Sequence, residues 1–393
     1  MTPAARVQAA IELLDLIIAA ARDNGPPADR IIAEGFRQRR YAGSKDRRAI
    51  RDLAYAAIRA CGPLPASGRA AMLRLAELDT DIRGLFDGSP YGPAQIAQGE
   101  EPASAGLAPD WLEAKLAQSG IMGDEAAALL DRAPLDLRVN TLKASRATLE
   151  LPLAGEMLAA PNGLRLPHGT QVEQWYAYVQ GLVEVQDCGS QIACMAVGTM
   201  PGETVIDLCA GAGGKTLALA AAMENRGTLV AADTDRGRLS RLGPRAERAG
   251  AAIVETVLLN PGREREALAA WREAADAVLV DAPCSGTGTW RRNPEARWRL
   301  DPGQLEKLVT LQAYLLDLAA GLVRPGGRIT YVTCSLLEEE GKGQVERFLA
   351  AHSGWRADPP IVPLGSECGK GIRLTPYRDG TDGFFIARLF RTC

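Results

Sequence analysis

Histidine and paired cysteines are scarce in this chain of 393 residues, and their scarcity argues against several kinds of site. There are two histidines, His168 and His352, and eight cysteines, no two of which form a CxxC pair. Zinc sites commonly use such pairs together with histidine, so we expect no metal. A disulfide framework is typical of small secreted domains, and we therefore expect reduced thiols in a cytoplasmic protein.

Long apolar runs are also missing. No run reaches the roughly 20 residues that a membrane-spanning helix needs. The most apolar stretch near the N-terminus, IELLDLIIAAA at 11–21, contains two acids and lacks the basic region and cleavage site of a signal peptide. We expect this stretch to be a first helix of a protein that has no membrane partner and acts as a monomer.

An excess of one sign of charge is also missing, because acidic and basic residues nearly balance to a net charge of −3. Two segments are nevertheless locally basic. Residues 30–59 hold nine Arg or Lys against three acids, and residues 291–299 (RRNPEARWR) hold four Arg against one Glu. Such clusters can neutralise phosphates, and Arg or Trp can stack on unpaired bases. RNA contact and a solvated helix face remain alternatives for these segments.

Three regions of different character follow one another along the chain. Residues 1–132 carry apolar side chains at helical spacing, such as Val7, Ile11, Leu14 and Ile18, with interruptions by Pro and Gly, and predict a helical domain. Residues 133–199 contain short strand-like segments between loops and predict a small mixed α+β subdomain. In residues 200–393, apolar strands alternate with helical runs at 215–223, 236–249, 262–275 and 305–323, which indicates a parallel sheet with helices on both faces. The expected strands are 204–208, 228–233, 277–283, 328–335 and 383–390, the last of which would close the sheet as an antiparallel edge.

A glycine-rich loop, DLCAGAGGKT at 207–216, follows the first of these strands. A phosphate-binding P-loop requires a glycine where this chain has Cys209, which disfavours a nucleotide triphosphatase. The dinucleotide fingerprint G-x-G-x-x-G fits only in part, since Thr216 occupies its third glycine position. Asp233 ends the next strand, about twenty residues on, where a carboxylate can accept the hydroxyls of an adenosine ribose. These residues indicate an adenosine cofactor and leave hydride transfer and methyl transfer open.

Two further cysteines follow strands of the same predicted sheet. Cys284 lies in DAPCSGTG (281–288) and Cys334 lies in TCS (333–335). The carboxyl ends of parallel strands meet at the edge of the sheet where ligands bind, so both thiols should face the cofactor crevice. A single cysteine there would more often be inert packing. Two of them, flanked by small polar residues, favour chemistry.

Several segments together resemble the Sun/Fmu family of RNA 5-methylcytosine methyltransferases. They are DAPCSGTGTWRRNPEARW (281–298), YVTCSLLEEEG (331–341), RVNTLK (138–143), EVQDCGSQ (184–191) and DGFFIARLF (382–390). The helical N-terminus, with DRRAIRDLAYAAIR at 46–59, resembles the NusB-like RNA-binding domain of the RsmB branch. The resemblance implies a Rossmann-like class I methyltransferase domain at 200–393, a NusB-like domain at 1–132 and a small RNA-binding subdomain at 133–199.

The resemblance also implies a reaction and its residues. The expected reaction is S-adenosylmethionine-dependent methylation of cytosine C5 in small-subunit (16S) ribosomal RNA. A thiolate adds to C6 so that C5 can attack the methyl group. The family pattern makes Cys334 the nucleophile, gives Cys284 a role in product release and places Asp281 against the base and cofactor. The residues expected to bind the cofactor are Cys209, Ala210, Gly211, Ala212, Gly213, Gly214, Lys215, Asp233, Asn260 and Asp281.

The chain departs from the family pattern at two places. Gly211-Ala212 replaces a usual Ala-Pro, and Asn260 stands where an aspartate commonly meets the adenine. Other interpretations are therefore a transfer-RNA methyltransferase, or an RNA-binding ribosome assembly factor with weak activity. A DNA cytosine methyltransferase would use Cys284 as its nucleophile and leave Cys334 without a role. Arg138, Asn140, Gln186 and Asp187 could be structural or could line an RNA channel.

Overall fold

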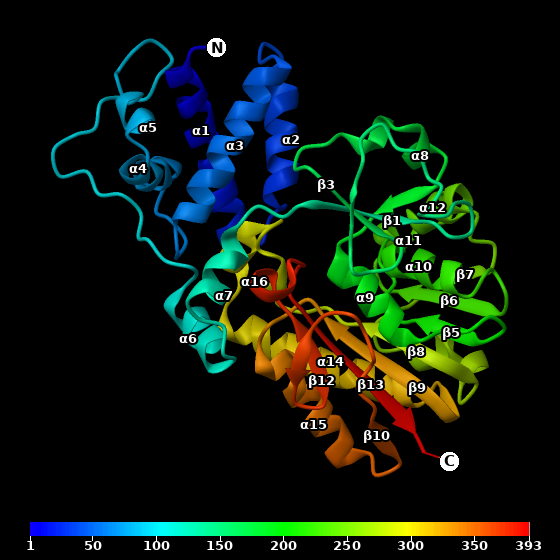
Figure 1. Ribbon diagram of the computed structural model, residues 1–393. Coiled ribbons are helices and arrows are strands. Elements are labelled where there is room, and N and C mark those ends of the chain that lie inside the picture. Colours follow the sequence, from blue (N-terminus) through cyan, green and yellow to red (C-terminus); the bar gives the residue numbers. More distant parts are fainter. Residues whose placement is uncertain (393) are drawn as a thin grey trace. The chain divides into compact units, whose positions relative to one another are not determined.

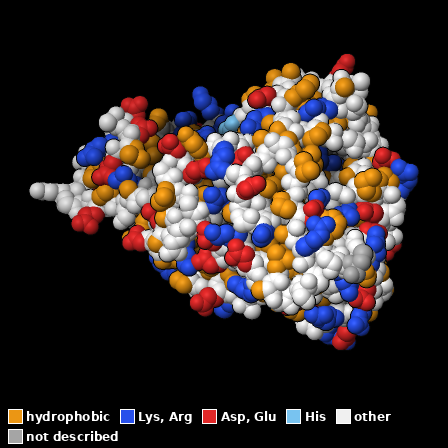
Figure 2. All heavy atoms as spheres, turned by 60° about the horizontal axis from the view of Figure 1, so that its bottom comes forward, with side chains coloured by type: hydrophobic (Ala, Val, Ile, Leu, Met, Phe, Trp, Pro, Cys, Tyr) orange, Lys and Arg blue, Asp and Glu red, His pale blue; other side chains and the backbone are white. Residues whose placement is uncertain are grey.

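The structure, a computed structural model, describes residues 1–392 and divides into two compact units. The helical unit consists of residues 1–131 together with 289–301, and the α/β unit consists of residues 132–288 and 302 onward. Within residues 1–392, no helix has the length and apolar character of a membrane span. Figure 2 shows basic, acidic and hydrophobic side chains interspersed on the face drawn there.

The helical unit begins with the helix expected from the apolar stretch at 11–21. Helix α1 (Pro3–Arg22) is capped by the Thr2 side chain and buries the predicted stripe of Val7, Ile11, Leu14 and Ile18. This stripe packs in one core with residues of the following helices. Those helices are α2 (Ala28–Gln38), α3 (Ser44–Ala60), α4 (Gly68–Leu78), α5 (Thr80–Gly84), α6 (Asp110–Gln118) and α7 (Asp124–Ala127).

The basic segment 291–299 belongs to this helical unit and not to the sheet domain in which the sequence places it. Its 3-10 helix (Pro294–Arg299) contains Arg297, which is fully buried and donates to the carbonyls of Ile58 and Cys61. Arg299 donates to the carbonyls of residues 20, 25 and 26. These two arginines stabilise the helical unit itself, because helix-terminal carbonyls accept hydrogen bonds from their guanidinium groups.

The first part of the α/β unit is a small antiparallel sheet. Its strands, in the order β2-β3-β1-β4, are β1 (Leu135–Val139), β2 (Glu156–Met157), β3 (Gly163–Leu166) and β4 (Val183–Val185). The short helix α8 (Tyr176–Val179) precedes β4, and α9 (Cys188–Val197) leads into the large sheet. The short strands predicted here are confirmed.

The large sheet has the strand order β11-β12-β13-β9-β8-β5-β6-β7, with β10 paired to β13. Figure 1 labels all of these strands except β11. The parallel strands are β5 (Thr204–Asp207), β6 (Thr228–Asp233), β7 (Val254–Leu258), β8 (Ala275–Asp281) and β9 (Val323–Thr333). Strand β13 (Phe384–Arg391) runs antiparallel to β9, as expected for the last strand, but it is not the expected edge of the sheet, because β12 and β10 also pair with it. The chain builds β6 and β7 on one side of β5 and β8 on the other, so the strand order reverses beside β5. Ligands bind at such a switch point.

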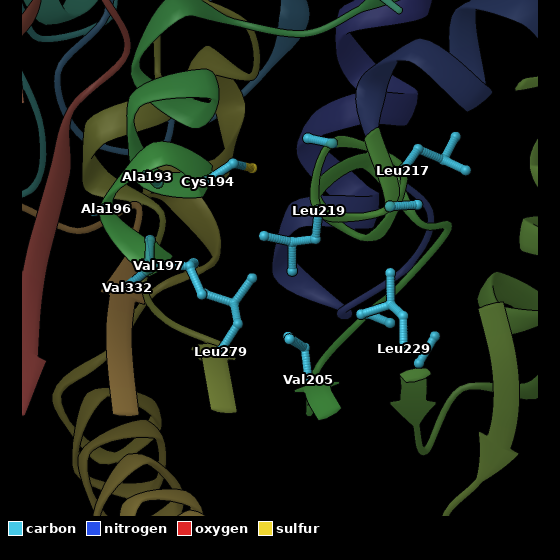
Figure 3. Packing of buried hydrophobic residues seen from close by; sticks show 14 of the residues in the cluster. Ala193, Cys194, Ala196, Val197, Val205, Leu217, Leu219, Leu229, Leu279 and Val332 are labelled. Atoms are coloured by element: carbon cyan, nitrogen blue, oxygen red, sulfur yellow. The ribbon is translucent and has the colours of Figure 1, made fainter. Parts of the chain in front are cut away.

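Alternate residues of the parallel strands enter two different cores. Val205 packs with α9 and with α10 (Gly214–Ala222), whereas its neighbour Ile206 packs with α14 (Pro302–Ala320). Figure 3 shows the first core, in which side chains from α9, such as Val197, and from α10, such as Leu219, lie over the strands. Burial on both faces explains why these strands are continuously apolar in the sequence.

The other elements of the α/β unit are short. The expected helix at 236–249 is divided into α11 (Arg236–Leu239) and α12 (Leu242–Ala249), and the run at 262–275 forms α13 (Glu264–Ala267) and a 3-10 turn. Strands β10, β11 and β12 carry no clear alternation and were not predicted. The remaining bounds are β10 (Trp355–Ala357), β11 (Ser366–Cys368), β12 (Gly371–Leu374), α15 (Lys342–Ala351) and α16 (Pro376–Asp379).

Candidate active site

The glycine-rich loop joins β5 to α10 and turns through two glycines of left-handed conformation. Gly211 has φ 56° and Gly213 has φ 86°. A Cβ on Gly213 would lie 2.0 Å from Leu242 Cδ1, whereas a Cβ on Gly214 would meet nothing within 4 Å. The loop therefore requires glycine at 213 for its own geometry, while Gly214 leaves open space at the start of α10.

We expect Gly213→Ala to lower the free energy of unfolding by about 2–5 kcal/mol, from the left-handed backbone and the overlap with Leu242. Gly214→Ala is the matched control and should be neutral or more stable by up to about 1 kcal/mol, because alanine suits a helix better than glycine. Urea unfolding followed by circular dichroism measures both. Equal stabilities of the two variants would contradict the packing described here.

A cavity of about 310 Å³ lies beside this loop. Most of the predicted cofactor residues line it, together with residues that sequence reasoning did not select. The lining residues from the prediction are Cys209, Ala210, Gly211, Ala212, Gly214, Lys215 and Asp281, and the added ones include Asp207, Ser190, Arg238 and Arg245. Arg238 and Arg245 lie on α11 and α12, where no motif or spacing distinguishes them from other surface arginines. Asp207 is the first residue of the glycine motif and could have been found from it.

Asp233 connects the end of β6 to the glycine loop. One of its carboxylate oxygens accepts the Gly211 N–H at 2.7 Å and the other accepts the Asp235 N–H at 2.7 Å. Asn260, by contrast, is exposed in the segment after β7 and is not among the residues that line the cavity. The assignment of Asn260 to the adenine stays a prediction.

Asp207 is a buried carboxyl with one unused oxygen. Thr216 donates its hydroxyl to Oδ2 at 2.7 Å, while Oδ1 has no partner within residues 1–392. Burial raises the pKa of Asp207 to about 7, against the opposing Thr216 hydrogen bond. Near neutral pH this group therefore changes its charge inside the cavity wall.

This pKa predicts a pH dependence of stability with a definite sign. Because the folded-state pKa lies above the unfolded value, the contribution of Asp207 is full below about pH 4 and is lost as pH rises through about 7. We expect Asp207→Asn to gain about 2–4 kcal/mol over the wild type between pH 4 and pH 8. Urea unfolding of both proteins at the two pH values measures this difference. A difference that does not change with pH would contradict the assignment.

Lys215 and Asp281 form an ion pair across the cavity wall. Lys215 Nζ lies 2.6 Å from Asp281 Oδ2 and 5.6 Å from the centre of the Phe384 ring. Burial alone would lower the pKa of Lys215, but the Asp281 carboxylate outweighs burial and raises it. The pair brings the start of α10 to the end of β8, where the Cys284 loop begins.

The two predicted catalytic cysteines lie together. Cys284 follows β8, Cys334 follows β9, and their Sγ atoms are 3.4 Å apart. The two loops are also joined through backbone, since Gly288 donates its N–H to the Cys334 carbonyl. The hydrogen bond to Cys334, followed by burial, raises the pKa of the Cys284 thiol well above its ordinary value. Cys284 therefore retains a proton that it can share with Cys334.

The other candidate residues divide into structural and cavity-lining groups. Asn140 is structural, because its amide donates to the carbonyls of Gly181 and Ala249. Gln186 and Asp187 line the cavity, and Arg138 donates to Gln186 Oε1 at 2.7 Å. Burial raises the pKa of Cys209 well above its ordinary value, as expected for a packing cysteine.

A sheet of this order, with a glycine loop after its first parallel strand and an acid after the second, defines an S-adenosylmethionine-dependent methyltransferase of the Rossmann-like class I fold. Solved structures share this architecture. The crystal structure of PH0851 has a TM-score of 0.74 and 27% identity, and the match covers 99% of both chains. The structure of NSun6 from Pyrococcus horikoshii with SFG has a TM-score of 0.59 and 21% identity, covering 71% of this chain and 97% of that one.

Sequence comparisons define the family within this class. A family model described as 16S rRNA methyltransferase RsmB/F matches residues 194–390. The probable ribosomal RNA small subunit methyltransferase B of Synechocystis sp. is 36% identical over 299 residues, which are 72% of this chain and 66% of that protein. The enzyme of that name from Sodalis glossinidius is 33% identical over 314 residues, 76% of this chain and 69% of the relative. The chain belongs to the RsmB/F family of 16S rRNA methyltransferases.

These findings confirm the predicted family, fold class and cofactor. The NusB-like character of the N-terminal helices and the predicted domain boundaries stay predictions. The chain spans about two thirds of the length of the two relatives described above.

Proposed function

We propose that this protein transfers a methyl group from S-adenosylmethionine to C5 of a cytosine in small-subunit ribosomal RNA. The observation that carries the proposal is the pair of thiols, Cys284 and Cys334, whose sulfur atoms lie 3.4 Å apart. Both follow parallel strands at the edge where the cavity lies. A covalent route through a thiol adduct needs a nucleophile and a nearby group that assists its departure, and this pair supplies both.

The residues around the cavity fit S-adenosylmethionine. Gly211 and Gly214 let backbone N–H groups approach a ligand closely. The Asp233 carboxylate accepts two backbone hydrogen bonds, and its oxygens keep further lone pairs that can accept from ribose hydroxyls. The unused Oδ1 of Asp207 offers an acceptor to an ammonium group. The bound cofactor supplies an electrophilic methyl group on a sulfonium sulfur.

In the first steps, the Cys334 thiolate adds to C6 of the cytosine. The new S–C6 bond moves the C5=C6 electron pair into the ring, so that C5 becomes nucleophilic. C5 could then accept the methyl group with one pair of ring electrons, which would leave the sulfonium of the bound cofactor as a neutral thioether. Asp281, which pairs with Lys215, lies on the cavity wall where it can contact the base.

Product release is the proposed task of Cys284. Its pKa is raised chiefly by its hydrogen bond to Cys334. That hydrogen bond is lost once Cys334 is bonded to the base, and the pKa of Cys284 then falls. Cys284 can then lose its proton to solvent and, as a thiolate, take the proton from C5. The C5–H electron pair restores the C5=C6 bond, the C6–S bond breaks, and Cys334 returns as a thiolate.

The target base must be accessible, which favours a single-stranded or transiently open RNA segment. The basic cluster 30–59 of the helical unit supports RNA binding. Arg30, Arg37, Arg40, Lys45 and Arg51 of this cluster are exposed. We propose the NusB-like fold for these helices on the resemblance of 46–59.

Transfer of tritiated methyl groups to unmodified 16S ribosomal RNA, compared with unmodified transfer RNA, tests the function. We expect incorporation into the ribosomal RNA, at a cytosine that bisulfite sequencing then identifies. Incorporation into neither RNA would refute the proposed enzyme, and preference for transfer RNA would overturn the proposed substrate.

A further inference from the structure

Glu340 is a fully buried carboxylate that touches neither the cofactor cavity nor solvent. It lies in the 3-10 turn Glu338–Glu340, six residues after Cys334. Within residues 1–392, no Lys, Arg or His forms an ion pair with it. Burying an unpaired charge is costly unless several hydrogen bonds satisfy it. Its placement therefore requires an explanation.

All the hydrogen bonds of this carboxylate come from the Cys284 loop or from its support. Oε1 accepts the Ser285 N–H at 2.9 Å, and Oε2 accepts the Ser285 hydroxyl. Gln312 of α14 donates to Oε1 at 2.9 Å and also to the carbonyl of Pro283, on the other side of Cys284. The residues before and after Cys284 are therefore both tied to one buried group.

A chain of hydroxyl groups extends this connection to the Cys334 loop. Ser285 Oγ lies 3.2 Å from Ser335 Oγ, which lies 3.2 Å from Thr287 Oγ1. Ser335 directly follows Cys334, and its Oγ also accepts the Leu337 N–H at 3.1 Å. All three hydroxyl groups are buried. The relative position of the two sulfur atoms thus depends on contacts that centre on Glu340.

We propose that Glu340 is a positioning residue of the reaction, whose buried carboxylate holds the Cys284 loop against the Cys334 loop and thereby controls release of the methylated product. This inference rests on the proposed function. Glu340 does not touch the base; it acts through Ser285 on the orientation of Cys284. Its negative charge also raises the pKa of Cys284, after the larger effects of Cys334 and burial. A thiol of higher pKa gives a more basic thiolate, which suits removal of the C5 proton.

Glu340→Gln removes the negative charge of this side chain while it keeps nearly the same size and shape. The amide keeps one oxygen acceptor for the Ser285 N–H, and the Ser285 hydroxyl can rotate to accept from the new NH₂ group. The matched control is Glu338→Gln in the same turn, where the glutamate is partly exposed and pairs with Lys342. The control should leave turnover unchanged.

The first measurement needs no RNA. Alkylation of Cys284 by iodoacetamide, followed by peptide mass spectrometry across a pH series, reports the ionisation of this thiol. The ionisable groups that act with Cys284 are Cys334, Glu340 and Tyr331, with Arg347 and Cys209 acting on Tyr331. We expect the alkylation midpoint in Glu340→Gln to fall by about one pH unit, since a nearby like charge is removed. The control should keep the wild-type midpoint.

The second measurement follows the covalent protein–RNA adduct on denaturing gels with unmodified 16S ribosomal RNA. We expect Glu340→Gln to turn over about 10-fold more slowly and to accumulate the adduct, because a Cys284 thiolate made less basic removes the C5 proton less readily. A merely structural role would reduce the folded fraction without accumulating adduct.

The outcomes distinguish this inference from the proposed function. A wild-type alkylation midpoint in Glu340→Gln, or turnover without adduct accumulation, would overturn the role of Glu340 while methylation by the wild type stands. Failure of the wild type to methylate any RNA would instead refute the proposed function, whatever the alkylation experiment shows. A folded Glu340→Gln protein that loses adduct and turnover together would also overturn the inference, since it would place Glu340 before bond formation.

Discussion

Cys334→Ala should abolish methyl transfer, and Cys284→Ala should trap the protein on its RNA. Removing the thiol that adds to C6 leaves C5 too weak a nucleophile, and we expect a fall of at least about 10³-fold in rate, as for loss of other covalent nucleophiles. In Cys284→Ala, addition and methyl transfer proceed, but the C5 proton has no acceptor in place. The methylated adduct should therefore accumulate as a band of reduced mobility on denaturing gels.

The double variant is the decisive control for this assignment. Cys284→Ala combined with Cys334→Ala should form no adduct, because the sulfur that bonds to C6 is gone. Cys194→Ala removes another buried thiol, for which burial raises the pKa to about 11, and it should leave the wild-type behaviour intact. An adduct that persists without Cys334 but disappears without Cys284 would reverse the two roles. That result would match the DNA cytosine methyltransferase alternative.

Arg297→Met should strongly destabilise the helical unit. The guanidinium group of Arg297 donates to Ile58 at 2.7 Å, to Cys61 at 2.5 Å and to Pro294. Methionine fills similar space but leaves these buried carbonyls without donors, each costing about 1–3 kcal/mol. We expect the free energy of unfolding to fall by about 3–5 kcal/mol in urea titrations followed by circular dichroism.

Arg40→Met provides the comparison, since Arg40 is exposed in the same unit. Its stability should stay within about 0.5 kcal/mol of the wild type, as for most surface substitutions. Arg297→Lys keeps the charge with fewer aligned donors and should lie between the two. A loss below about 1 kcal/mol in Arg297→Met would show that the carbonyls find other donors and that Arg297 does not hold this unit together.

The large sheet was predictable because its signals are local. The parallel strands β5, β6 and β8 and the second half of β9 are buried on both faces, so they appear as short apolar runs between helical runs and were expected close to their observed positions. Strand β7 lies at one edge of the sheet, is partly exposed and was not expected. Strands β10, β11 and β12 lie at the other end of the sheet, carry mixed side chains and were not expected either. The run at 236–249 was expected to form one helix and forms two, α11 and α12. Pro244 has no backbone N–H to continue the hydrogen bonds of α11, and it lies in the first turn of α12, where proline is tolerated.

The candidate site was predictable for the same reason, but only as a set of residues. Asp233, Asp281, Cys284 and Cys334 each follow a strand, and the carboxyl ends of parallel strands meet at one edge. The basic segment 291–299 shows where this reasoning fails. Its charge pattern resembles an RNA contact, yet Arg297 is buried against carbonyls some 240 positions away in the sequence.

The sequence by itself therefore determined the class of fold, the position of the glycine-rich loop and the choice of Cys284 and Cys334 as candidate thiols, because each depends on residues close together in the chain or on a general rule of parallel sheets. Only the tertiary structure decided the 3.4 Å separation of the sulfur atoms, the ties from Glu340 to the Cys284 loop and the arginines that line the cavity. Those contacts join residues from separate elements, and their geometry follows from packing that no local pattern records.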